Sequence, residues 1–147
     1  MKLATRARHV PPRIAAGAFI LSSGLSKLEK IDDDQTAEGL HGMARGTYPF
    51  LDQLPPRTFL KVLCGSEIAL GAALLALPVV PTALAGAGLS AFSGSLLGIY
   101  LRAPGMRREG SLAPTDAGMP MAKDVWMLGI GLGFLTDAVV TRLTRRR

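Results

Sequence analysis

Residues 59–78 read Phe59-Leu-Lys-Val-Leu-Cys-Gly-Ser-Glu-Ile-Ala-Leu-Gly-Ala-Ala-Leu-Leu-Ala-Leu-Pro78, and between Val62 and Leu77 the only charged residue is Glu67. At about 1.5 Å of rise per residue, this stretch is long enough for a helix to cross a hydrocarbon layer of about 30 Å. A carboxylate near the middle of such a helix is costly unless it faces other helices and finds a partner. The stretch therefore predicts a membrane-spanning helix whose one charged group is turned into a helical bundle.

The composition of the whole chain points the same way. Of its 147 residues, 48% are hydrophobic, 19% are charged and 17 are glycine. A soluble domain usually carries about 25% charged residues. Glycine inside a soluble helix costs about 1 kcal/mol relative to alanine, whereas in membrane helices small residues let neighbouring backbones approach. We expect an integral membrane protein.

Three further apolar stretches accompany the first, and we expect one domain over residues 1–147 with an all-α fold. This polytopic bundle would have four transmembrane helices, over about residues 12–30, 58–78, 82–101 and 124–141. The first stretch has the basic-then-apolar order of a signal peptide, but no small-residue cleavage site follows it, which favours an uncleaved helix. In the first loop, Asp33 or Asp34 can cap a short amphipathic helix, and a second short piece follows, although a solvated loop fits almost as well.

Basic residues flank the apolar stretches at both ends of the chain, and the two long loops hold a similar number of Lys and Arg. The net charge is +6, and the basic residues outside the apolar stretches include Lys2, Arg6, Arg8 and Arg13 before the first and Arg142, Arg145, Arg146 and Arg147 after the last. This is the distribution of cytoplasmic flanks of membrane helices, so nucleic acid is not an expected partner. Four spans place both termini on one side, and we expect them in the cytoplasm, with the protein in the plasma membrane.

Small residues recur at every fourth position of the third stretch, as Thr82, Gly86, Ser90, Gly94 and Gly98. Such a series predicts close helix packing, either within the chain or between two copies through the Gly94/Gly98 face. In the fourth stretch, Gly129 and Gly133 share a helical face with Asp137 and are further candidates for packing.

Three motifs resemble the DoxX-like family of small integral membrane proteins, in its actinobacterial branch. They are Gly24-Leu25-Ser26-Lys27-Leu28, then Gly65-x-Glu67-x-x-x-Gly71-x-x-Leu74, and Ala122-Lys123-Asp124-Val-Trp-Met-Leu-Gly-Ile130. The resemblance implies a four-helix membrane bundle. It also implies a link to membrane-associated redox complexes, because the family name derives from a subunit of a thiosulfate:quinone oxidoreductase and mycobacterial members are linked to an oxidoreductase complex with superoxide dismutase and a sulfurtransferase.

Lys27 and Glu67 are expected at similar depths on helices that are neighbours in sequence, which predicts an ion pair inside the bundle. Such a pair serves either to fix the register of the helices or as a polar site for a quinone, a proton or a small anion. Asp137, the third ionisable candidate, lies near the end of the fourth stretch, where an interfacial salt bridge is expected, with Arg142 nearby in the sequence.

Other chemistry has little support. The single cysteine, Cys64, is expected to be an apolar filler, and His9 and His41 have no partners at metal-ligand spacing, so we predict no metal site. The motifs of serine hydrolases and phosphate-binding loops are absent from the sequence. We expect a protein that is not catalytic by itself and anchors soluble redox proteins at the membrane. The alternatives are a quinone-linked oxidoreductase component, or a small-solute or lipid binding or transport protein, both using Lys27 and Glu67.

Overall fold

The computed structural model describes residues 7–77 and 79–144, and all regular elements in these ranges are helical. The expectation of an all-α chain is confirmed. The elements are α2 (Val10–Leu28), α3 (Asp34–Thr47), the 3-10 helix η1 (Pro49–Gln53), α4 (Pro56–Leu75), α5 (Thr82–Arg102), α6 (Met119–Ala122) and α7 (Asp124–Thr144).

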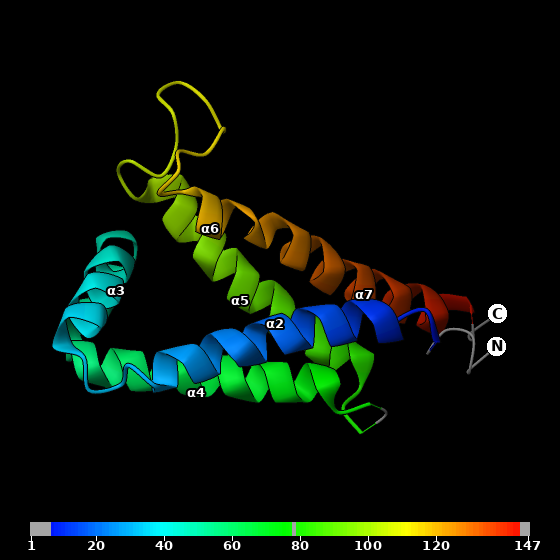
Figure 1. Cartoon of the computed structure of the whole chain (residues 1–147). Helices are drawn as coiled ribbons and strands as arrows, with labels where there is room; N and C mark the ends of the chain where they lie inside the picture. Colours follow the sequence, from blue (N-terminus) through cyan, green and yellow to red (C-terminus); the bar gives the residue numbers. More distant parts are fainter. Residues whose placement is uncertain (1–6, 78, 145–147) are drawn as a thin grey trace.

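The four long helices form two antiparallel pairs, α2 with α4 and α5 with α7 (Figure 1). The pairs meet at the end of the molecule where α2 begins and α7 ends, and they diverge toward the opposite end, where α3 lies (Figure 1). A core cluster holds the pairs together where they meet; its buried members are Ala16, Ile20, Leu74, Ala85, Leu89 and Phe134. Because the pairs diverge away from this core, side chains of both can line a common space at the other end.

The loop between α2 and α4 contains the expected amphipathic helix. Its N-cap is Asp33, whose carboxylate accepts a hydrogen bond from the backbone N–H of Gln35 at 3.1 Å. The buried face of α3 includes Ala37, which packs with Leu60 and Cys64 of α4. The α3 helix therefore covers the beginning of α4 rather than extending freely into solvent, and Cys64 is a buried filler of this small core.

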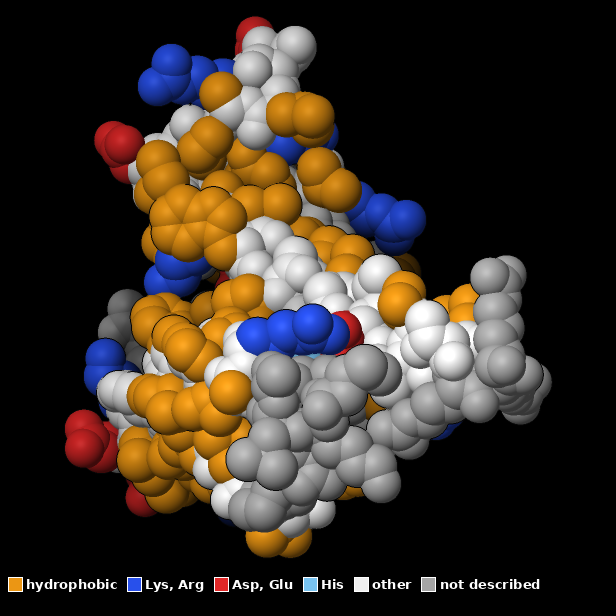
Figure 2. Space-filling view, turned by 90° about the vertical axis from the view of Figure 1, so that its right-hand side faces the viewer, with side chains coloured by type: hydrophobic (Ala, Val, Ile, Leu, Met, Phe, Trp, Pro, Cys, Tyr) orange, Lys and Arg blue, Asp and Glu red, His pale blue; other side chains and the backbone are white. Residues whose placement is uncertain are grey.

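Three helical segments are long and apolar enough to cross a membrane: Pro56–Leu75, Thr82–Arg102 and Met119–Thr144. Much of their surface is apolar and exposed, as expected for lipid contact, and hydrophobic side chains spread over the face seen in Figure 2. The α2 helix is not among the three, although its 19 residues are nearly enough for a span; Arg13 and Lys27 lie within it. The helix expected over about residues 58–78 ends earlier, at Leu75, because the backbone at Ala76 leaves the helical conformation shortly before Pro78.

Close helix contacts are made by some of the expected small residues and not by others. A Cβ on Gly86 would lie 2.7 Å from Cβ of Phe134, and one on Gly131 would lie 2.5 Å from Oγ of Ser90, so α5 and α7 approach closely there. Gly98 is covered by the hydroxyl of Tyr48.

In the described part of the chain, nothing lies within 4 Å of a Cβ position on Gly94, Gly129 or Gly133. A four-residue step advances about 40° around a helix of 3.6 residues per turn. After two or three steps, the small residues of α5 therefore no longer face α7. The five-position series is therefore not one continuous seam within the chain.

Candidate functional site

Lys27 of α2 and Glu67 of α4 form an ion pair between the two helices. Nζ of Lys27 lies 3.0 Å from both carboxylate oxygens of Glu67. The Glu67 side chain is only 5% exposed, whereas that of Lys27 is 24% exposed. The helices come close enough for this contact because Gly24 has no side chain: a Cβ there would lie 3.0 Å from Cβ of Glu67. The pair thus depends on the glycine one turn before Lys27.

Ser23 completes this polar group. Its hydroxyl accepts a hydrogen bond from Nζ of Lys27 at 2.6 Å and donates one to Oε1 of Glu67 at 3.3 Å. Ser23 and Lys27 are four residues apart and so lie on one face of α2. The ammonium group consequently has a partner for each of its three N–H bonds, as a buried charge requires.

The ion pair lines a cavity of about 210 Å³ that lies between the two helix pairs. Residues from α2, α3, α4, α5, α6 and α7 line it, and most of its walls are apolar; the apolar lining residues are Phe19, Ile20, Leu40, Leu63, Phe92, Leu96, Pro120, Met121 and Met127. A mostly apolar cavity with a few convergent polar groups is the usual form of a small-molecule site. It lies where the two pairs diverge and borders the shared core, because Ile20 belongs to both.

Two charged residues reach the cavity from α7 and the residue before it. Asp124 is 4% exposed, and Lys123 has its Nζ 4.4 Å from the centroid of the Phe19 ring, a cation–π distance. The sequence marked Asp124 only as the first residue of the stretch over about 124–141, where a carboxylate suits a helix N-terminus, and as part of the third motif. The sequence does contain a Lys-Asp pair next to a long apolar helix, but this pattern does not tell which side of the helix the pair faces. Sequence alone therefore could not place Asp124 in the cavity.

Asp137 does not belong to this site. It forms an ion pair with Arg8, and its Oδ2 lies 3.3 Å from Nε2 of His9, at the end of the molecule where α2 begins. In the described ranges Arg142 is exposed and has no ion pair with Asp137. The start of α2 lies beside the last turns of α7, and this tertiary contact supplies a partner that the local sequence does not. The grouping of Asp137 with Lys27 and Glu67 is therefore corrected.

The structural role of Arg13 was not predicted from the sequence. This residue was assigned to the basic flank, but it is 1% exposed, and its guanidinium donates hydrogen bonds to two carbonyl groups at the end of α4 and to one in the turn that follows. The acceptors are the oxygens of Ala73 at 2.7 Å, Leu74 at 2.8 Å and Val80 at 3.0 Å. The last carbonyls of a helix lack partners within it, so Arg13 caps α4 from the neighbouring helix.

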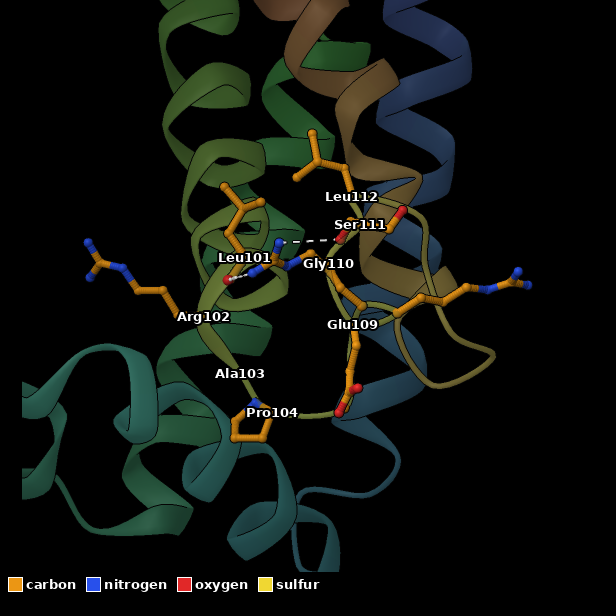
Figure 3. Close-up of a pocket in the computed structure, with 11 residues that line it drawn as sticks. Leu101, Arg102, Ala103, Pro104, Glu109, Gly110, Ser111 and Leu112 are labelled. Atoms are coloured by element: carbon orange, nitrogen blue, oxygen red, sulfur yellow. Dashed lines mark hydrogen bonds between the residues drawn. The ribbon is translucent and has the colours of Figure 1, made fainter.

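Two more hollows lie at the surface and are less suited to a site. One is enclosed by residues 101–112, where Arg107 donates hydrogen bonds to the carbonyl oxygens of Leu101 at 2.8 Å and Ser111 at 3.4 Å (Figure 3). Arg102 and Glu109 point away from it (Figure 3). The other lies between α3 and η1, beside His41. Within the described ranges, no three His, Cys, Asp or Glu side chains come together as metal ligands.

Comparisons with known proteins add no identification: no family model matches the sequence, no curated protein is significantly similar to it, and no solved structure matches the fold. The class defined by fold and site is that of a small helical protein with three helices compatible with a membrane and a charged cavity between its helix pairs. The resemblance to DoxX-like proteins stays a prediction.

Proposed function

We propose that the chain is a four-helix integral membrane protein in which α2 is the fourth span. The positions of the charged side chains of α2 support this proposal. Arg13 is buried against the end of α4 and Lys27 is paired with Glu67, whereas the exposed large side chains of α2 are apolar: Ile14, Phe19, Leu25 and Leu28. A helix that presents apolar side chains outward and keeps its charges inside meets the requirements of lipid contact.

The orientation that we propose has both termini in the cytoplasm and the plasma membrane as the location. Both helix pairs are antiparallel, so α2 begins and α7 ends at the same end of the molecule (Figure 1). Basic residues near both termini support a cytoplasmic position for that end. Arg8 and Arg142 are described by the structure, whereas Lys2, Arg6 and residues 145–147 lie outside the described residues.

Within this framework we propose that the cavity beside Lys27 and Glu67 binds the polar head of a small amphipathic molecule, with a quinone as the preferred class. The observation that carries the proposal is a buried ion pair opening onto a cavity with apolar walls. Engineered apolar cavities of about 150 Å³ hold benzene, so a volume of about 210 Å³ suits one substituted ring. The ammonium and carboxylate groups supply hydrogen bonds at the polar side of such a ring.

The test is purification in mild detergent at native expression level, followed by mass spectrometry of the small molecules that remain bound. We expect a quinone with the wild-type protein and its loss from Glu67→Gln, with Glu109→Gln, at an exposed loop residue, as the matched control. A phospholipid or polar solute released by the same substitution would instead assign the cavity to lipid or solute binding or transport. Protein that carries no small molecule and binds none of these classes when they are added would refute a ligand-binding role.

The second candidate is a non-catalytic subunit that anchors soluble redox proteins to the membrane. It is favoured by the resemblance to DoxX-like proteins and by the location of the α2 start and the α7 end at one end of the molecule (Figure 1). Removal of the basic residues 145–147 should then reduce the recovery of partner proteins from mild detergent, with Glu67→Gln as a variant that retains them. Equal recovery with and without the tail would argue against anchoring through this end.

A further inference from the structure

Among the described charged groups that line the cavity, Asp124 is buried without a hydrogen-bond or ion-pair partner. Asp124 is 4% exposed and lines the cavity together with Lys27 and Glu67. Among the described residues, no hydrogen bond reaches its carboxylate and no cationic nitrogen lies within 4.0 Å of it. Its oxygens are not among the fully enclosed, unpartnered side-chain atoms of the described residues, so the little accessible surface that Asp124 has opens into the cavity. A largely buried carboxylate without a protein partner is costly unless a ligand, an ion or water satisfies it.

The two lysines at the cavity are both engaged elsewhere. Lys27 donates to Glu67 and Ser23, and Nζ of Lys123 lies over the ring of Phe19. With two ammonium groups and two carboxyl groups around one cavity, the charges balance when Asp124 is ionised. An ionised carboxylate only accepts hydrogen bonds. The group that completes the cavity must therefore be a hydrogen-bond donor.

The donor is expected to be a neutral hydroxyl group on an aromatic ring. The four charged groups of the cavity already balance, so a cationic ligand would add an unpaired charge to a low-dielectric site, whereas a hydroxyl group adds none. Phe19, Phe92, Met121 and Met127 give the cavity walls that suit the faces and edges of a ring. A hydroquinone has two such hydroxyl groups, whereas the corresponding quinone has only acceptors there.

We propose that Asp124 accepts a hydrogen bond from a ring hydroxyl and so makes the cavity select a hydroquinone over the matching quinone. This inference rests on the proposed function, because it names the redox form of the ligand class assigned to the cavity. It assigns to Asp124 a part in specificity that is separate from the Lys27–Glu67 pair. A hydrogen bond to a charged acceptor accounts for a preference of about tenfold or more.

The experiment measures binding of a decyl-substituted benzoquinone and of its hydroquinone to the purified protein in detergent, at pH 7.5 under argon, by equilibrium dialysis. We expect the wild-type protein to bind the hydroquinone about tenfold more tightly than the quinone. Asp124→Asn should lose that preference by weakening hydroquinone binding, since a neutral amide is a weaker acceptor and also donates to carbonyl oxygens. Asp116→Asn, at an exposed carboxylate of the preceding loop, should behave as the wild type.

The outcomes separate this inference from the proposed function. Equal binding of both forms by the wild-type protein, unchanged in Asp124→Asn, would overturn the role of Asp124 and leave the cavity as a quinone site. Binding of neither form would overturn the proposed function itself.

A second measurement, of the unfolding temperature, tests whether substitution of Asp124 destabilises the protein. Because the described structure gives Asp124 no ion-pair or hydrogen-bond partner, ligand-free Asp124→Asn and Asp124→Leu lose only the favourable interaction with the N-terminus of α7 and should unfold within a few degrees of the wild type. Marked destabilisation of both would show that the carboxylate has a structural partner, and would overturn the inference.

Discussion

The Lys27–Glu67 pair predicts an asymmetric response to mutation. Lys27→Met leaves a carboxylate that is 5% exposed, with only the hydroxyl of Ser23 at 3.3 Å to satisfy it. Glu67→Gln leaves an ammonium group on a side chain that is 24% exposed and flexible enough to move toward the cavity or the interface. The two halves of one ion pair should therefore differ in cost.

The expected magnitudes follow from this difference in burial. Loss of the partner of a buried charge costs about 3–5 kcal/mol, which is the expectation for Lys27→Met. For Glu67→Gln we expect about 1–2 kcal/mol, because the amide still accepts from Ser23 and the lysine relocates. The double variant replaces both charges by neutral groups of similar shape and should lie within about 1 kcal/mol of the wild type. The two single costs sum to about 4–7 kcal/mol, so the coupling energy between the two sites is at least about 3 kcal/mol.

The assay is reversible unfolding in mixed micelles of a mild detergent and dodecyl sulfate, followed by far-ultraviolet circular dichroism for the wild type, both single variants and the double variant. Lys27→Met should be the least stable of the four, and the second substitution should restore most of the loss. Additive losses in the double variant would refute the reasoning, because they would mean that the two groups do not interact. Equal costs for the two single variants would contradict the argument from burial.

Three further predictions concern the cap of α4, the α5–α7 contact and the orientation in the membrane. Arg13→Met removes two hydrogen bonds to carbonyl groups at the end of α4 and one to the following turn, and should lower the free energy of unfolding by about 3 kcal/mol. Arg8→Met, at a more exposed side chain, should cost about 1 kcal/mol or less, and equal costs in the same unfolding assay would argue against the cap. Gly86→Leu should destabilise the α5–α7 contact by about 1–3 kcal/mol, and Gly129→Leu should be neutral; if Gly129→Leu instead changes the oligomeric state in cross-linking, that face joins two copies. Ser111→Cys should react with a membrane-impermeant maleimide on intact cells, and labelling only after lysis would reverse the proposed orientation.

The positions of the helices could be predicted from sequence because the length and hydropathy of a segment, and the residues that start and end a helix, are local properties. The stretch at about residues 82–101 corresponds to α5 (Thr82–Arg102), and the one at about 124–141 corresponds to α7 (Asp124–Thr144). The helix in the first loop begins after Asp33, one of the two residues predicted as its cap. Proline, an aspartate cap and the polarity of loops act over a few residues, so their effect is visible without the fold.

The packing of the glycine series was less predictable. The spacing of Gly86 and Ser90 indicates close contact, and α7 lies against both. Gly94 carries the same signal but has open space in the described structure. The spacing shows that a helix can be approached closely, but whether a neighbour is present depends on the angle between α5 and α7, which no local pattern encodes.

The amino-acid sequence by itself determined that this protein is helical and where its long helices lie, and it predicted the Lys27–Glu67 pair. It predicted four spans, of which three are long and apolar enough to cross a membrane. Only the tertiary structure decided that Arg13 caps α4, that Asp137 pairs with Arg8, and that Asp124 lines the cavity with Glu67. Helix formation follows from hydrogen bonds and side chains within a few residues, whereas these contacts join residues far apart in the chain. They exist because two helix pairs meet at one end and diverge at the other.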